Sequence, residues 1–255
     1  MDPATLIGLG IAFGALFGSL IMDGVSLSSM FLPSPILLVV GGTIGAAIAG
    51  GVLRDAKEVG LALKKATMAK SVAPEDTIDE VVSLAERARR EGLLALEEAA
   101  GQVQDPFLAD GLRAAIDGTD PEDLRDMLHS RIDSKRKADR VIAKVYTDMG
   151  GYAPTVGIIG TVMHLVKVLE NLSEPGKLGP AIAAAFIATL WGVMTANLVW
   201  LPIAARLKRL SDLECSQMEL VLEGVLSIQA GANPRLVAQR LQSLVPQADA
   251  EKAAA

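Results

Sequence analysis

Four long apolar segments dominate the hydrophobic pattern of this 255-residue chain. They cover residues 6–22, 35–53, 152–169 and 178–205, and their centres contain no acidic residue. A helix needs about 20 predominantly apolar residues to cross a hydrocarbon layer about 30 Å thick. Each segment is close to that length, so the pattern predicts four transmembrane helices.

The polar parts of the chain are also helical by pattern. Apolar side chains in residues 78–88 recur on one helical face, and the spacing of Thr77 and Glu80 predicts a capping box at the start of that helix. Asp120 followed by Pro121 predicts a second start. Alternating β-branched runs are absent from the sequence. The fold class is therefore an all-α membrane protein with a large helical insert between spans 2 and 3 and a helical tail.

Composition supports a protein of the lipid bilayer. Hydrophobic residues make up 51% of the chain, and the mean hydropathy is +0.38, which is too apolar for an ordinary soluble domain. The single cysteine, Cys215, excludes an intrachain disulfide and a thiolate metal site. The net charge of −6 argues against a nucleic-acid partner, because phosphate binding requires a basic face.

The basic residues predict the orientation of the spans. Residues 23–34 contain no lysine or arginine, and Lys177 is the one basic residue in the loop between the last two spans. The opposite flanks are basic, so the positive-inside rule places them and both termini in the cytoplasm. The flanking residues are Arg54, Lys57, Lys64, Lys65, Lys70, Arg206, Lys208 and Arg209. The predicted domains are 1–53 (spans 1 and 2 with a short periplasmic loop), 54–150 (cytoplasmic helical domain), 151–205 (spans 3 and 4) and 206–255 (cytoplasmic helical tail).

The last two spans carry hydroxyl and amide groups where an ion pathway would normally offer a carboxylate. These residues are Thr155, Thr161, Thr189, Thr195 and Asn197. In one interpretation each side chain bonds a carbonyl one turn earlier in its own helix. In the other, Thr161 and Thr189 face each other and supply oxygen ligands to a cation whose counter-charge comes from another chain.

Other residues in these spans also have two interpretations. Glycines such as Gly157, Gly160 and Gly192 predict close helix packing and an oligomeric assembly. In one interpretation Pro154 marks a helix entry and Pro202 a bend. In the other, the two prolines are hinges that couple events in the membrane to the insert.

Two basic residues, His164 and Lys167, lie inside the third span on one helix face by their spacing. His164 is either a packed side chain or a proton relay. Lys167 is close enough to the outer end of the span to extend its amine to the interface.

Several long motifs resemble the MotA/PomA family, the ion-channel subunits of the bacterial flagellar stator. The membrane motifs are PTVGIIGTVM (154–163), VLENL (168–172), LGP (178–180), AFIATLWG (185–192) and ANLVWLPIA (196–204). The insert adds AERARREGLLALEE (85–98), and the tail adds EGVLSIQAGANPR (223–235). The resemblance covers nearly the whole chain.

The resemblance implies a homopentamer of this chain around a dimer of a MotB-like partner. The partner would supply the ion-binding aspartate, and ion flow would drive torque on a FliG-like rotor protein at the insert. The residues that match family positions are Thr161 and Thr189 for the ion pathway, Pro154 and Pro202 for conformational coupling, and Arg89, Arg90, Glu97 and Glu98 for rotor binding. If a helix continues through Gly92, then Arg89 and Glu97 lie about two turns apart on nearly one face.

The resemblance also implies an inner-membrane, non-enzymatic protein without a cofactor or bound metal. The transported cation is H⁺ or Na⁺. In the family a hydroxyl at the position of Thr161 often accompanies sodium use, and an alanine there often accompanies proton use. The ion preference also depends on the partner helix. His164 departs from the family pattern, in which glycine is common.

Three other classes of protein compete with this interpretation. An ExbB/TolQ-like motor subunit would have three spans and an outside N-terminus. A secondary transporter would show internal pseudo-symmetry and a mid-membrane site. An enzyme would show a metal cluster, a nucleophile motif or a phosphate-binding loop, and the two histidines, His129 and His164, lie in separate regions.

Overall fold

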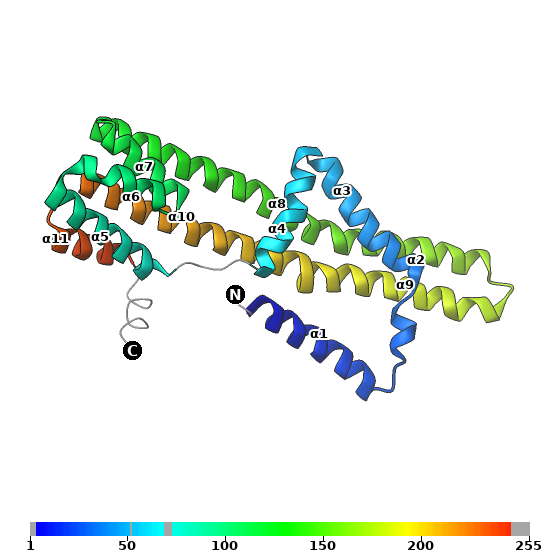
Figure 1. Ribbon diagram of the computed structural model, residues 1–255. Coiled ribbons are helices and arrows are strands. Elements are labelled where there is room, and N and C mark those ends of the chain that lie inside the picture. Colours follow the sequence, from blue (N-terminus) through cyan, green and yellow to red (C-terminus); the bar gives the residue numbers. More distant parts are fainter. Residues whose placement is uncertain (1–3, 52, 69–72, 246–255) are drawn as a thin grey trace. The chain divides into compact units, whose positions relative to one another are not determined.

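The computed structural model describes residues 4–51, 53–68 and 73–245, which form helices and no strand (Figure 1). The all-α fold class is therefore confirmed. The chain divides into two compact units, Met1–Lys70 with Asp139–Arg209 (unit 1) and Ser71–Ala138 with Leu210–Ala255 (unit 2).

Unit 1 contains the apolar helices. Its elements are α1 (Ala4–Met22), the 3-10 helix η1 (Leu27–Met30), α2 (Pro33–Ile36), the π-helix η2 (Leu37–Gly41), α3 (Gly42–Gly50), α4 (Leu53–Met68), the second part of α8 (Pro121–Glu170), α9 (Pro175–Thr195), the π-helix η4 (Ala196–Trp200) and the first part of α10 (Leu201–Gln229). In the part of the chain that the structure describes, three helical runs are long and apolar enough to cross a membrane: Pro33–Gly50, Pro121–Glu170 and Pro175–Gln229. A shorter apolar helix, Ile7–Met22, coincides with the first predicted span, and the number of spans stays a prediction.

Aromatic rings attach α1 to the other helices of unit 1. The ring centroids of Phe17 and Phe31 lie 6.1 Å apart, and those of Phe31 and Trp191 lie 5.6 Å apart, within the range of favourable aromatic pairs. Trp191 also donates from Nε1 to the carbonyl oxygen of Met30 at 2.8 Å. This one tryptophan of α9 therefore fixes the segment between the first two apolar helices.

Unit 2 is a helical bundle with a continuous aliphatic core. It comprises α5 (Pro74–Glu91), η3 (Leu93–Ala95), α6 (Leu96–Gln102), α7 (Pro106–Ile116), the first part of α8, the second part of α10, and α11 (Pro234–Leu244). Its most buried side chains are Val81, Leu96, Leu108, Leu112, Leu124, Leu128, Ile132, Val221, Val225, Val237 and Leu241.

Helix α5 does not begin at the predicted capping box. Its N-cap is Ala73, and Pro74 occupies the first helical turn, where a fixed φ and a missing N–H are tolerated. Thr77 is buried inside the helix, and its Oγ1 accepts a hydrogen bond from Nε2 of Gln217 at 2.5 Å. The capping-box prediction was wrong because a proline three residues earlier starts the helix.

Helix α8 begins where the sequence predicts and continues through the third predicted span. The backbone N–H of Glu122 donates to Oδ1 of Asp120 at 2.9 Å, which confirms the cap. The helix then runs for 50 residues to Glu170 without a break at Gly150. Both α8 and α10 therefore contribute to both units. The predicted boundaries at residues 53, 150 and 205 separate membrane-spanning from aqueous segments, and they stay predictions.

Side-chain bonds join α8 to α7 and α10 within unit 2. Arg136 donates to Glu219 at 2.7 Å, and this bond raises the pKa of the Arg136 guanidinium. Arg131 donates to Asp110 at 2.7 Å, and this bond holds the pKa of the Asp110 carboxyl below its usual range. Both pairs are exposed, so the buried aliphatic core contributes most of the stability.

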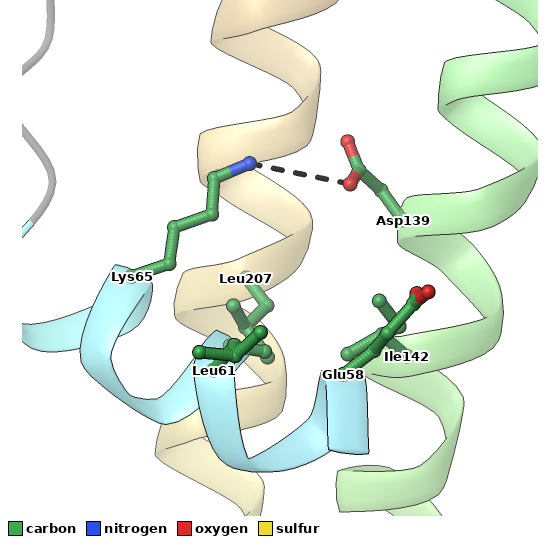
Figure 2. Close-up of a pocket in the computed structure, with 7 residues that line it drawn as sticks. Glu58, Leu61, Lys65, Asp139, Ile142 and Leu207 are labelled. Carbon is green, nitrogen blue, oxygen red and sulfur yellow. Dashed lines mark ion pairs between the residues drawn. The ribbon is translucent and has the colours of Figure 1, made fainter. Parts of the chain in front are cut away.

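Helix α4 contacts α8 and α10 through a tyrosine hydrogen bond, an ion pair and apolar side chains. The Tyr146 hydroxyl donates to the carbonyl oxygen of Val59 at 2.7 Å, and Ala62 packs in the same buried cluster. Figure 2 shows Lys65 beside Asp139, with Nζ and Oδ1 4.0 Å apart, at the rim of a cavity of about 300 Å³. The Lys65–Asp139 pair is partly exposed and adds to the attachment that Tyr146 and Ala62 provide.

Candidate functional site

Two glycines bring the backbones of α8 and α9 into direct contact. A Cβ atom on Gly192 would lie 2.7 Å from the carbonyl oxygen of Ala153, and one on Gly157 would lie 2.8 Å from that of Ala188. At Gly160 a Cβ would lie 2.8 Å from the Ala188 side chain. The predicted close packing through these three glycines is confirmed.

The same contact brings Thr161 of α8 and Thr189 of α9 together. Their Oγ1 atoms form a hydrogen bond, and both residues are half-buried. Thr161 Oγ1 also lies 3.1 Å from the carbonyl oxygen of Gly157 and 3.0 Å from that of Ala185. Because a hydroxyl has one proton to donate, it bonds these oxygens one at a time. The site is a cluster of neutral oxygens that lacks a carboxylate.

Three other polar side chains of the last two predicted spans bond carbonyl oxygens of their own helical run. The Thr155 hydroxyl donates to the carbonyl oxygen three residues earlier at 2.8 Å. The Thr195 hydroxyl and the Asn197 amide each donate to the carbonyl oxygen four residues earlier, at 2.7 and 2.9 Å respectively. The internal interpretation therefore holds for these three residues. Thr161 differs because its hydroxyl also contacts the neighbouring helix.

His164 follows Thr161 by one turn on α8. Its Nδ1 lies 2.7 Å from the carbonyl oxygen of Gly160, so Nδ1 carries the proton and donates. His164 and Lys167 line the same cavity, which agrees with the prediction that they share a helix face.

Pro154 and Pro202 lie on helices that touch. Pro154 is inside α8, and a Cβ on Gly192 would lie 3.3 Å from its Cα. Pro202 follows the π-helix η4, whose end is marked by a bond from the N–H of Leu201 to the carbonyl oxygen of Ala196. Proline removes one helical donor, and π-turns often occur at functional sites. The hinge role of these prolines stays a prediction.

The predicted rotor charges lie on two helices of unit 2. Helix α5 ends at Glu91, and Gly92 adopts a φ of +87°, which is open to glycine and strained for other residues. Arg89 is therefore on α5 and Glu97 on α6, so the condition of one continuous helix is not met.

An arginine that the sequence did not single out joins the two helices. Nε of Arg87 on α5 lies 3.3 Å from Oε2 of Glu91, and its Nη2 lies 3.7 Å from Oε2 of Glu98 on α6. Its spacing of four residues to Glu91 was a local signal for the first contact, but the second contact depends on the turn at Gly92. The four predicted residues, Arg89, Arg90, Glu97 and Glu98, are exposed.

The described residues offer no metal centre. Among them, no three His, Cys, Asp or Glu side chains are grouped as a metal ion would require.

Comparison with known proteins identifies relatives along almost the whole chain. The model of the MotA/TolQ/ExbB proton channel family matches residues 99–220, and that of the Motility protein A N-terminal family matches residues 6–92. Motility protein A of Bacillus subtilis (strain 168) is 37% identical over 98% of this chain and 93% of its own length.

Solved structures agree with the fold. The flagellar MotAB stator complex from Bacillus subtilis contains a chain that is 36% identical, with a TM-score of 0.90 and coverage of 98% of both chains. A chain of the C. jejuni MotAB structure matches with a TM-score of 0.92 over 96% of both chains, at 24% identity, and shows the shared fold.

Proposed function

The chain belongs to the motility protein A (MotA) family, and from this premise we propose how it works as a stator subunit of a flagellar motor. It forms a cation channel in the inner membrane together with a MotB-like partner, and it converts ion flow into torque. The family consists of ion-channel subunits and not of enzymes. The single observation that carries the mechanism is the contact between Thr161 and Thr189.

The neutral oxygen cluster is half of an ion site. A cation that leaves water needs a counter-charge, and the apolar segments of this chain contain no carboxylate. A dimer of the MotB-like partner supplies it as an aspartate on a membrane helix, surrounded by five copies of this chain. The similarity to a MotAB stator complex supports such a partner. The transported cation is H⁺ or Na⁺, and no cofactor takes part.

Ion binding to that aspartate removes a buried charge and lets the ring of subunits step around the partner. The membrane potential supplies about 2.3 kcal/mol per charge per 100 mV. Pro154 and Pro202 act as hinges in this step. The contact of their helices supports the role, and α8 and α10 each extend into both units.

Both termini and unit 2 are cytoplasmic in this proposal, as the loop charges indicate. Arg89, Arg90, Glu97 and Glu98 contact a FliG-like rotor protein. Their exposure supports the proposal, because surface ion pairs of under about 1 kcal/mol form and break readily.

A TolQ/ExbB-like role is the second candidate, since the family description includes those proteins. The match of residues 6–92 to the Motility protein A N-terminal model favours the flagellar role.

Expression of the chain with its native partner in a stator-deleted, non-motile host tests the function. We expect swimming to be restored, and to stop when the partner's aspartate is replaced by asparagine. Swimming speed against sodium concentration, compared with the effect of a proton uncoupler, identifies the cation. A host that stays non-motile although the complex reaches the membrane, or cation conduction by this chain without the partner, would contradict the proposal.

Charge reversal tests the rotor contact. The double variant Arg89→Glu/Glu97→Lys should swim several-fold more slowly at unchanged ion conduction, because it inverts contacts that each contribute under about 1 kcal/mol. Arg235→Glu, at an exposed position of α11, is a control for the reversal of a single surface charge and should swim normally. Normal torque in the double variant would remove these residues from the mechanism.

A further inference from the structure

We propose that the cavity between α2, α8 and α9 binds the phosphate of an anionic phospholipid, with phosphatidylglycerol as the best fit. The cavity has a volume of about 380 Å³, and its walls include Pro35 and Ala184. Two lysines, Lys167 and Lys177, and the imidazole of His164 line it, and none of the lining residues is acidic.

The charge of the rim favours an anion. Lys177 has one acidic neighbour, Glu174, at 2.8 Å, which leaves the positive charge of Lys167 in excess. A lysine-lined mouth repels cations, so this cavity does not serve as the entrance of the ion pathway. Ammonium groups bind phosphate as compact point charges.

The depth of the cavity matches a lipid headgroup. Lys167 lies three residues before the end of α8, and Lys177 is the third residue of α9. Pro33–Gly50 has 18 residues, which corresponds to about 27 Å of helix, and the cavity includes its first residues, Pro33 to Pro35. The ends of three apolar helices therefore meet here, at the level where phosphates lie.

The apolar surface next to the cavity favours a lipid over a free anion. Leu37 lies one turn beyond Ser34, a lining residue, and is 75% exposed. An acyl chain along α2 would cover it. A free phosphate would leave it uncovered, and burial of apolar surface favours binding.

His164 adds a preference among lipids. Since its Nδ1–H donates to Gly160, the neutral ring has Nε2 left as an acceptor. A glycerol headgroup offers hydroxyl donors for that atom, whereas a choline headgroup offers none.

Native mass spectrometry of the purified complex with its partner tests the proposal. Delipidated complex is mixed with phosphatidylglycerol, phosphatidylcholine or inorganic phosphate. Wild-type complex should retain phosphatidylglycerol in preference to phosphatidylcholine. Lys167→Gln/Lys177→Gln should retain at least fivefold less, because a lysine near an anionic lipid contributes about fivefold and Glu174 offsets part of the charge of Lys177. Lys137→Gln/Lys144→Gln removes equal charge from exposed positions of α8 and should behave as wild type.

Acylation of lysines in the delipidated complex shows whether phosphatidylglycerol, inorganic phosphate or the partner chain occupies the cavity. Phosphatidylglycerol should protect Lys167 and Lys177, and phosphate at equal concentration should not. Equal protection by phosphate, equal retention by the two double variants, or protection by the partner chain without lipid would each overturn the proposal. Motility plays no part in these readouts, so the result is independent of the proposed function.

Discussion

Gly192→Ala should abolish swimming, whereas Gly179→Ala on the same helix should leave it unchanged. The new methyl group at residue 192 would lie 2.7 Å from the carbonyl oxygen of Ala153 and 3.0 Å from Cα of Gly157. Both are backbone atoms, which cannot rotate away as a side chain can. Helices α8 and α9 must separate, and that separation pulls Thr161 away from Thr189.

The control isolates this effect from helix propensity. A Cβ on Gly179 would have no atom within 4 Å, and alanine is favoured over glycine in a helix interior by about 1 kcal/mol. Both substitutions therefore gain the same stabilisation from helix propensity, and the steric contact is the difference between them.

Swimming speed is measured together with the amount of complex in the membrane. Gly157→Ala is a second variant, because its Cβ would lie 2.8 Å from the carbonyl oxygen of Ala188 on the opposite side of the contact. Normal swimming by either variant would show that the distance between the helices does not control the ion pathway.

Features encoded in adjacent residues could be predicted from the sequence. The Asp120 cap needs only two neighbours along the chain, and the structure has it. The glycines of α8 and α9 predict that helices approach closely, because glycine has no side chain and its position is read directly from the sequence. The all-α fold follows from the length of the apolar segments and from the helical periodicity of residues 78–88.

Features that depend on the rest of the chain could not be predicted in this way. Thr77 has the spacing of a cap, but Pro74 starts the helix and Gln217 uses its hydroxyl. A helix can include a glycine, but the positive φ of Gly92 ends α5 and separates Arg89 from Glu97. The bond from Trp191 to Met30 joins residues far apart in the sequence, and no local pattern indicates it.

The candidate site at Thr161 and Thr189 was only partly predictable. The apolar segments contain several hydroxyls, and the sequence leaves open which of them bond within their own helix. The structure separates Thr161, which contacts Thr189 and a carbonyl of α9, from Thr155 and Thr195, which bond their own helices. That distinction depends on how α8 and α9 pack.

The same distinction predicts a large functional effect. With Na⁺ as the transported cation, Thr161→Val/Thr189→Val should lower ion conduction and swimming by 100-fold or more, because valine keeps the shape of threonine and removes the oxygen. A hydrogen bond or ligand to a charged group contributes about 1.5–3 kcal/mol. Two such losses correspond to roughly 3–6 kcal/mol, or about 100-fold to 10,000-fold.

Two sets of variants control this experiment. Thr161→Ser/Thr189→Ser keeps both hydroxyls and should retain most of the activity. Thr155→Val and Thr195→Val remove hydroxyls that bond carbonyls of their own helix, so each should conduct almost normally. Uptake of the cation is measured in proteoliposomes that contain the partner. Full uptake by the double valine variant would mean that the cation passes without binding these oxygens, and the pathway would then have to be placed elsewhere in the complex.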